Sequence, residues 1–121
     1  MTGLASEYVI DRLSTHLLDT TVGTPAAGIP ATLEHLAPDG NTTACGHGIT
    51  DADGRIEQLN GEPLVPGEYR LILSTGGYFA RSHGVTFYPS VTLQFLLDGQ
   101  RRHYHIAVLA STYSYTAYLG S

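Results

Sequence analysis

Short segments in which apolar and polar residues alternate follow one another along most of the chain, separated by turns rich in Gly, Pro, Asp and Asn. Alternation with a period of two is typical of β-strands that bury one face. The segments with this pattern span residues 12–19, 29–37, 43–50, 68–75, 88–97, 101–111 and 112–120. Short strands at this spacing in one domain predict an all-β sandwich. The segment 76–84 breaks the alternation and is compatible with one short helix, and the turn at 98–100 predicts an antiparallel hairpin between the strands that flank it.

The chain has 121 residues, of which 42% are hydrophobic, so it is long enough to form one domain with a packed core. Residues 1–11 show no period and are expected to form a flexible N-terminal arm, with residues 12–121 forming the single domain. The N-terminal segment lacks the apolar run of a signal peptide, and no segment approaches the roughly 20 apolar residues of a membrane span. We therefore expect a cytoplasmic protein without membrane contact.

Charged residues make up only 14% of the chain, the formal net charge is −5, and every cationic side chain is an arginine. A nucleic-acid binder needs a basic face to neutralise phosphates, and the sequence offers no basic cluster beyond Arg101 and Arg102. Nucleic acid is therefore not an expected partner. The low charge suggests that much of the surface meets another subunit. The single cysteine, Cys45, excludes an internal disulfide and any site built from several cysteines.

Among the histidines that fall within predicted strands, three lie at positions that suggest a site, on faces that the period of two defines. His103 and His105 share one face of their strand, and His16 shares a face with Arg12 and Ser14. A single strand histidine is more often a hydrogen-bonded structural residue, whereas two on one face favour a site. A His-x-His pair is also half of a zinc site, but such a site needs a third ligand from another segment.

Arg55 ends a tight, Asp-rich turn and offers a permanently charged fork for a carbonyl-rich or anionic ligand. The alternative for this arginine is a surface ion pair with Asp51 or Asp53. Cys45 and His47 share a strand face, but no third group orients them, so nucleophilic catalysis is poorly supported. The sequence contains no phosphate-binding glycine loop and no nucleophile elbow, so catalysis by this chain would activate water.

Several separated blocks, in a fixed order, carry a resemblance to a known family. They are LSTHLLDTTVGTPAAGIPATLE (13–34), TDADGRI (50–56), PGEYRLILSTGGYF (66–79), FYPSVTLQF (87–95) and HYHIAVLASTYSYTAYLGS (103–121). Together they resemble the transthyretin-related proteins that act as 5-hydroxyisourate hydrolases in urate breakdown. The resemblance covers nearly all of the chain after residue 12, and several blocks in order are far more specific than any one of them.

The resemblance implies a transthyretin-like β-sandwich of two four-stranded sheets with a short helix near 76–83. It implies a homotetramer, a dimer of dimers, with active sites in the cleft between dimers and with no cofactor or metal. The implied reaction is the hydrolysis of 5-hydroxyisourate to 2-oxo-4-hydroxy-4-carboxy-5-ureidoimidazoline by attack of water on a ring amide. The implied catalytic residues are His16, Arg55, His105 and Ser121, and the implied substrate-binding residues are His103, Tyr118 and Leu119.

The chain departs from the family pattern near its last strand. The family's C-terminal Tyr-Arg-Gly-Ser is Tyr-Leu-Gly-Ser here, so that Leu119 replaces a guanidinium. The usual His-x-Pro is His-Ile-Ala here, and Ala107 restores a backbone N–H that proline lacks. The Ile-Ala pair and the Tyr-Ser-Tyr segment at 113–115 are closer to the hormone-carrying transthyretins. The alternative function is therefore binding of a small hydrophobic ligand without hydrolase activity, and a third is a structural or interaction module.

Overall fold

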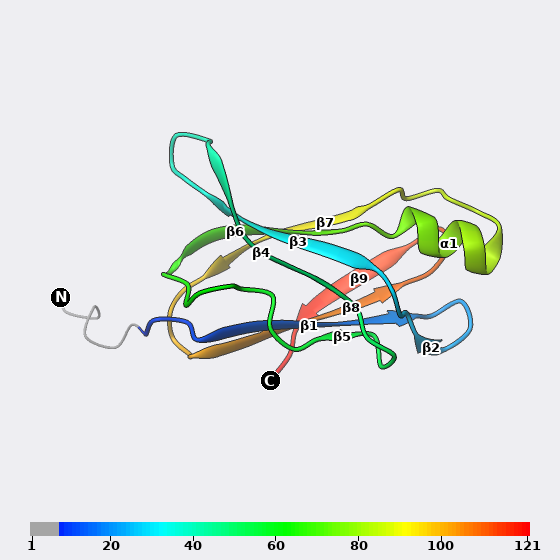
Figure 1. Ribbon diagram of the computed structural model, residues 1–121, viewed down its shortest axis with the longest axis horizontal. Helices are drawn as coiled ribbons and strands as arrows, with labels where there is room; N and C mark the ends of the chain where they lie inside the picture. Colours follow the sequence, from blue (N-terminus) through cyan, green and yellow to red (C-terminus); the bar gives the residue numbers. More distant parts are fainter. Residues whose placement is uncertain (1–7) are drawn as a thin grey trace.

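The chain folds into a sandwich of two β-sheets, with a short helix at one end (Figure 1). The computed structural model describes residues 8–121. In chain order the elements are β1 (Arg12–Asp19), β2 (Thr24–Pro25), β3 (Pro30–Leu36), β4 (Thr42–Ile49), β5 (Arg55–Ile56), β6 (Gly67–Leu73), α1 (Gly76–His83), β7 (Val91–Leu97), β8 (His103–Ala110) and β9 (Tyr115–Leu119). The predicted strands and the short helix are confirmed. In this part of the chain no helix has the length and apolar character needed to cross a membrane.

The two sheets differ in strand direction, because one strand pair of the first sheet is parallel. The first has the order β2-β1-β8-β9, with the two-residue strand β5 also paired to β1, and the second has the order β4-β3-β6-β7. The pairing of β1 with β8 is parallel, whereas the other strand pairs are antiparallel. The expected transthyretin-like sandwich is confirmed, with β5 as a small addition to the first sheet. Strand β8 keeps an unbroken register with both neighbours through Ala107, where a proline would remove a ladder N–H.

The predicted hairpin on either side of residues 98–100 is wrong. Strand β7 pairs with β6 in one sheet, while β8 lies between β1 and β9 in the other. Leu97 at the end of β7 and Tyr104 near the start of β8 are both buried in the core between the sheets. Side chains that fill one core from its two sides require their strands to lie in opposite sheets. The turn therefore carries the chain from one layer of the sandwich to the other.

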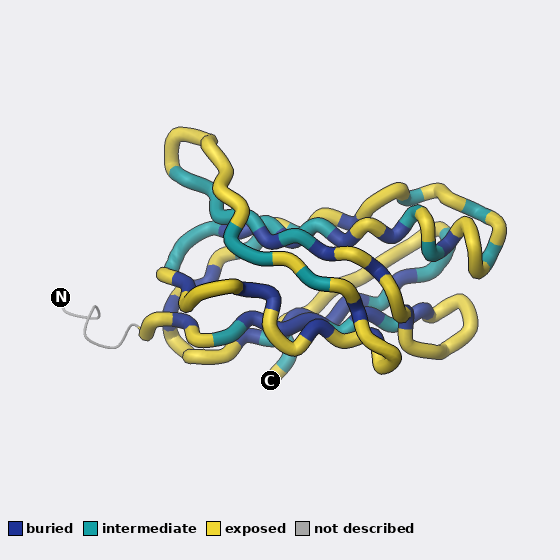
Figure 2. The backbone as a smooth tube through the Cα atoms, in the orientation of Figure 1, coloured by how far each residue is buried: buried dark blue, intermediate teal, exposed yellow. Residues whose placement is uncertain are grey.

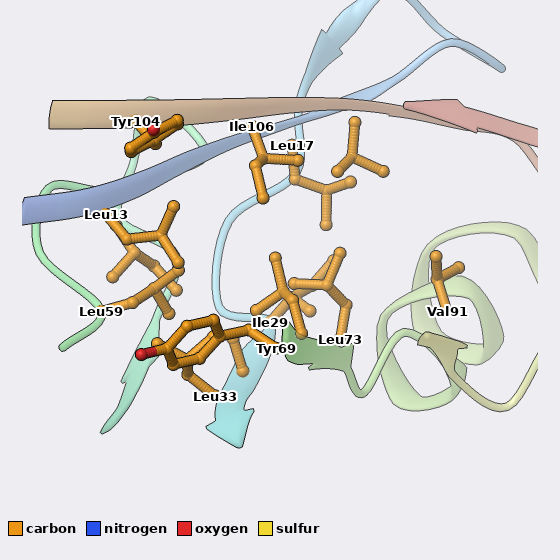
Figure 3. Packing of buried hydrophobic residues seen from close by; sticks show 14 of the residues in the cluster. Leu13, Leu17, Ile29, Leu33, Leu59, Tyr69, Leu73, Val91, Tyr104 and Ile106 are labelled. Atoms are coloured by element: carbon orange, nitrogen blue, oxygen red, sulfur yellow. The ribbon is translucent and has the colours of Figure 1, made fainter. Parts of the chain in front are cut away.

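The core lies between the two sheets and is built from alternate residues of the strands. Figure 2 shows that buried positions follow the facing strands and that the loops are mostly exposed. The side chains in Figure 3 that fill the space are Leu13, Leu17, Ile29, Leu33, Leu59, Tyr69, Leu73, Val91, Tyr104 and Ile106. Because side chains of a strand alternate between its faces, the polar residues of β1 and β8 that lie between these core positions point to the outer face of their sheet.

The packed domain begins slightly before Arg12. Ile10 is fully buried and pairs with Leu64, each backbone N–H donating to the other residue's carbonyl at 2.8 Å. Of the arm expected at 1–11, residues 1–7 lie outside the described part of the chain. Contacts with the core therefore extend at least to Ile10, which the period of the sequence does not indicate, because a single residue in an isolated bridge has no periodic neighbours.

Candidate active site

The parallel pairing of β1 with β8 brings the histidines of the two strands onto one surface. The aligned pairs at this end are Arg12 with His103, Ser14 with His105, and His16 with Ala107. Residues aligned in neighbouring strands share a face of the sheet. The opposite face of both strands is committed to the core, so these side chains lie on the outer face, which we call the histidine face.

The three imidazoles of the histidine face lie close together without touching. The ring centroid of His105 is 6.5 Å from that of His16 and 6.5 Å from that of His103. His16 and His105 are half-buried and His103 is exposed.

Ser14 joins two of these histidines. Its hydroxyl Oγ lies 2.8 Å from Nε2 of His103 and 2.7 Å from Nδ1 of His105, and the residue is only 4% exposed. On the other side of His103, Nη2 of Arg12 lies 3.3 Å from Nδ1. The period of two in the sequence places Arg12 and Ser14 on the face of His16 but indicates no role for them, because their contacts depend on the register between two strands far apart in the chain.

His16 is fixed from the other side by the turn before β5. Its Nε2 lies 2.9 Å from the carbonyl oxygen of Asp53. The carboxylate of Asp51 accepts the backbone N–H groups of Asp53 and Arg55, each at 2.9 Å, which closes the turn. Gly54 has φ +77°, and a Cβ there would lie 2.3 Å from the carbonyl oxygen of Leu17. The turn thus requires glycine and holds its backbone against β1.

Arg55 lies beside His16, because these two residues are aligned where β5 pairs with β1. Its side chain is exposed, and the carboxylate of Asp51 is engaged by backbone N–H groups rather than by the guanidinium. Within residues 8–121 the guanidinium of Arg55 takes part in no ion pair. The alternative of a surface ion pair with Asp51 or Asp53 is therefore not what the structure shows, and the charge is available to a ligand.

Burial and neighbouring cations keep the paired histidines neutral. Burial, together with the positive charge of Arg55 and the other two imidazoles, lowers the pKa of His105 from its ordinary value of 6.5. Burial and the charge of Arg12 lower the pKa of His103 in the same way. Neutral imidazoles can accept or donate a proton at neutral pH, which is the property that acid–base chemistry needs.

The end of the chain contributes to the histidine face through some of its residues. Tyr118 is aligned with Ala107 and therefore shares the face of the histidines, whereas Leu119 is aligned with Ile106 and shares the opposite face. Leu119 lines a groove of about 440 Å³ between β7 and β9, and Tyr118 also borders this groove. The backbone N–H of Gly120 donates to the carbonyl oxygen of His105 at 2.7 Å, and the exposed Ser121 follows it. The structure thus joins His16, Arg55, His103, His105 and Tyr118 on one face and leaves the Leu119 side chain on the other.

The geometry gives little support to metal binding or to catalysis by a cysteine nucleophile, the two other chemistries that the sequence left open. Within residues 8–121, no group of three or more His, Cys, Asp or Glu side chains is arranged to hold a metal ion. Burial, with the nearby charge of Glu34, raises the pKa of Cys45, and its thiol points to the carbonyl oxygen of Leu33. A protonated thiol is a poor nucleophile.

The fold and the histidine face together define a transthyretin-like β-sandwich protein that carries a polar imidazole and guanidinium site on the outer face of one sheet. Residues 13–120 match the HIUase/Transthyretin family. The chain belongs to this family.

Relatives of known name include both branches of the family. The chain is 41% identical over 110 residues to a 5-hydroxyisourate hydrolase of Salmonella dublin, a match that covers 90% of this chain and 80% of the relative. Among solved structures, the 5-hydroxyisourate hydrolase of Klebsiella pneumoniae superposes with a TM-score of 0.80 at 30% identity, covering 93% of this chain and all of the other. Sea bream transthyretin in complex with thyroxine superposes with a TM-score of 0.82 at 28% identity, covering 90% and 94%.

Proposed function

We propose that the chain is a 5-hydroxyisourate hydrolase of purine degradation, which adds water to a ring amide and yields 2-oxo-4-hydroxy-4-carboxy-5-ureidoimidazoline. The observation that carries the proposal is the convergence of His16, His105 and Arg55 on one face from three separate strands. The identity of 41% to a relative with that name supports it. The reaction needs no cofactor, because the imidazoles and the guanidinium of the histidine face supply its proton transfers and its charge stabilisation.

The chemistry follows from the properties of the side chains. A neutral imidazole takes a proton from water as the oxygen attacks the amide carbonyl, and a positioned base of this kind contributes about 10²–10⁴-fold to the rate. The guanidinium of Arg55 stabilises the oxyanion that develops, which contributes roughly 10²–10³-fold. The ring C–N bond then breaks and the departing nitrogen takes up a proton. Water is thereby added across one C–N bond, with no change in oxidation state.

The replacement at 119 does not weaken the proposal. Leu119 is aligned with Ile106, so its side chain leaves the sheet on the face away from the imidazoles. The alternative of a carrier for a small hydrophobic ligand is favoured by the exposed aromatic and apolar side chains of β9, such as Tyr118 and Leu119. A hydrophobic ligand, however, gains nothing from a face on which three imidazoles and a guanidinium meet, because desolvating these groups costs free energy.

We also propose a homotetramer, a dimer of dimers, with the histidine faces in the cleft between dimers. In the described sheets, β7 and β9 are end strands that each pair on one side. Such edges are open to pairing with another chain. Leu96 on β7 is 75% exposed and Leu119 on β9 is 54% exposed, and both line the groove between these strands, which is the kind of apolar surface that another subunit covers.

The test is the decay of freshly generated 5-hydroxyisourate, followed by ultraviolet absorbance, with the parent chain, His16→Ala and His47→Ala. His47 is an exposed histidine of β4 in the other sheet and is the matched control. We expect acceleration by the parent and by His47→Ala, and a loss of about 100-fold or more in His16→Ala. Without acceleration by the parent the hydrolase proposal fails, and saturable binding of thyroxine by that inactive chain would establish a carrier instead.

A further inference from the structure

The direction of each hydrogen bond around the histidines can be assigned, because one end of the network is an arginine. Nη2 of Arg12 lies 3.3 Å from Nδ1 of His103. A guanidinium has donors and no acceptor, so Nδ1 of His103 accepts and carries no proton. The proton of the neutral His103 ring is therefore on Nε2.

The hydroxyl of Ser14 lies between the two histidines, so its hydrogen bond with His103 determines the direction of its hydrogen bond with His105. The Nε2–H of His103 donates to Oγ of Ser14 at 2.8 Å. A serine hydroxyl has one proton to give, and its oxygen lies 2.7 Å from Nδ1 of His105, so the hydroxyl donates there. The neutral His105 ring must then carry its proton on Nε2. Because Ser14 is only 4% exposed, water does not readily replace either partner.

His16 offers a ligand a hydrogen-bond acceptor, whereas His105 offers a donor. The Nε2 of His16 lies 2.9 Å from the carbonyl oxygen of Asp53, which can only accept, so Nε2 carries a proton, and in the neutral ring Nδ1 is then the acceptor. Among residues 8–121, neither Nδ1 of His16 nor Nε2 of His105 has a hydrogen-bond partner. The two rings are 6.5 Å apart between centroids. One free acceptor and one free donor thus lie on the same face.

We propose that Ser14, oriented by Arg12 through His103, is a positioning residue that fixes the proton of His105 on Nε2, so that His105 is the hydrogen-bond donor to the substrate and His16 is the base. The proposal rests on the hydrolase function and deepens it, since it assigns separate roles to two imidazoles that the sequence left equivalent. His16 and His105 are the catalytic residues in this scheme, and Ser14 acts through His105.

The proton balance of the step is then defined. Nδ1 of His16 takes one proton from water as the O–C bond forms, and the carbonyl electron pair moves to oxygen, where Arg55 and the Nε2–H of His105 stabilise it. When the pair returns, the ring C–N bond breaks and the nitrogen takes the proton held by His16. Both imidazoles end in the state in which they began, so the cycle needs no other reactant than water.

The first test measures the tautomers directly in the full chain by NMR of ¹⁵N-labelled histidine, with the signals assigned from His→Gln variants. We expect protonated Nε2 and bare Nδ1 for both His16 and His105. In Ser14→Ala we expect His105 to become a mixture of tautomers and His16 to keep its own, whereas Ser14→Thr, which retains the hydroxyl, should keep the parent signature. Ser111→Ala, which removes a serine hydroxyl just after the far end of β8, is the matched control. A proton on Nδ1 of His105, or an unchanged His105 signature in Ser14→Ala, would overturn the proposal.

The second test uses glutamine, whose side-chain amide can donate from the position of Nε2 but cannot take up a proton. We expect His105→Gln to retain kcat within roughly tenfold of the parent and His105→Ala to lose roughly 10²–10³-fold. His16→Gln should be as inactive as His16→Ala. Ser14→Ala should lose roughly tenfold in kcat with KM little changed, because the donor on His105 acts on the oxyanion that forms in the transition state. Equal losses in His105→Gln and His16→Gln would refute the division of roles. The tautomer measurement needs no turnover, so it remains decisive even if the hydrolase function itself fails.

Discussion

The backbone N–H of Gly120 donates to the carbonyl oxygen of His105 at 2.7 Å, so the end of the chain is tied to the strand that carries a catalytic imidazole. A Cβ at position 120 would lie 2.8 Å from Cδ2 of the His105 ring and 3.2 Å from its carbonyl oxygen. That ring is held in place by Ser14. The close approach of backbone to imidazole therefore explains glycine at this position.

Gly120→Ala should displace the His105 ring without unfolding the domain. Because the ring must shift by several tenths of an ångström, we expect kcat/KM to fall about tenfold, in line with the sensitivity of catalysis to small misplacements. The matched control is Gly61→Ala, since a Cβ there meets no atom within 4 Å. Thermal unfolding should be similar for both variants and the parent. Equal kcat/KM in the two variants would show that the ring tolerates the methyl group.

Arg55→Lys should retain the charge but lose the planar pair of donors. A lysine cannot hold a carbonyl oxygen in two parallel hydrogen bonds, so we expect kcat/KM to fall roughly 10- to 100-fold. Stability should be unaffected, because the Arg55 side chain is exposed and forms no ion pair within residues 8–121. Arg81→Lys, on the exposed surface of α1, is the control and should match the parent in the decay assay.

The lowered pKa values of His103 and His105 predict a pH dependence of stability. In the unfolded chain these rings bind a proton near pH 6.5, whereas in the folded chain they resist protonation to lower pH. Between the folded pKa values and 6.5 the unfolded state holds more protons, so the free energy of unfolding decreases as the pH falls through this window. Urea unfolding between pH 7.5 and mildly acidic pH should show a shallower decrease in the double variant His103→Gln/His105→Gln. The same slope in both proteins would contradict the shifts.

A second ionisable cluster joins the helix to the end of β1. The buried carboxylate of Asp19 accepts hydrogen bonds from the hydroxyl of Tyr78 at 2.7 Å and from His83 at 2.6 Å. Burial alone would raise the pKa of Asp19, but the bonds from His83 and Tyr78, together with the bond from the backbone N–H of Thr21 and the charge of His83, lower it below 3.8. Tyr78→Phe removes one donor to a charged acceptor, so we expect a loss of about 1.5–3 kcal/mol in the free energy of unfolding at neutral pH.

The sign of the pH effect distinguishes this contribution from ring packing. A carboxylate whose folded pKa lies below its unfolded value stabilises the fold above the unfolded pKa and loses this effect as the pH falls through the folded pKa. The difference between parent and Tyr78→Phe in urea unfolding should therefore shrink below pH 3.8. Tyr113→Phe, at a side chain that is 61% exposed, is the control and should be neutral. A constant difference across the pH range would assign the loss to packing.

The sequence predicts the parts of this molecule that depend on local pattern. Alternation identifies the strands and correctly separates the core face of β8, with Tyr104 and Ile106, from the face of His103 and His105. It also places Ser14 on the face of His16. These predictions succeed because a period of two is fixed by the backbone of a single strand.

Pairing between strands, by contrast, is not encoded locally. The turn at 98–100 looks like a hairpin, yet burial of Leu97 and Tyr104 from opposite sides of the core places the strands in different sheets. The hydrogen bonds of Ser14 to two histidines depend on a parallel register across about 90 residues of chain, which no short-range pattern specifies. The same register determines which face Leu119 takes.

The same register determines what the family's C-terminal arginine would contact in this chain. Leu119 is aligned with Ile106 and Tyr118 with Ala107, so the two neighbours leave the sheet on opposite faces and Tyr118 is the one beside the imidazoles. We expect Leu119→Arg to leave kcat/KM within about threefold of the parent, because a guanidinium there enters the groove between β7 and β9 instead of the site. Tyr118→Ala should raise KM roughly tenfold, since a large aromatic contact with the substrate is lost. Both values come from the decay assay over a range of substrate concentrations, with Thr116→Ala, further along β9, as the control. A gain of tenfold or more in Leu119→Arg would mean that the side chain at 119 reaches the histidine face after all.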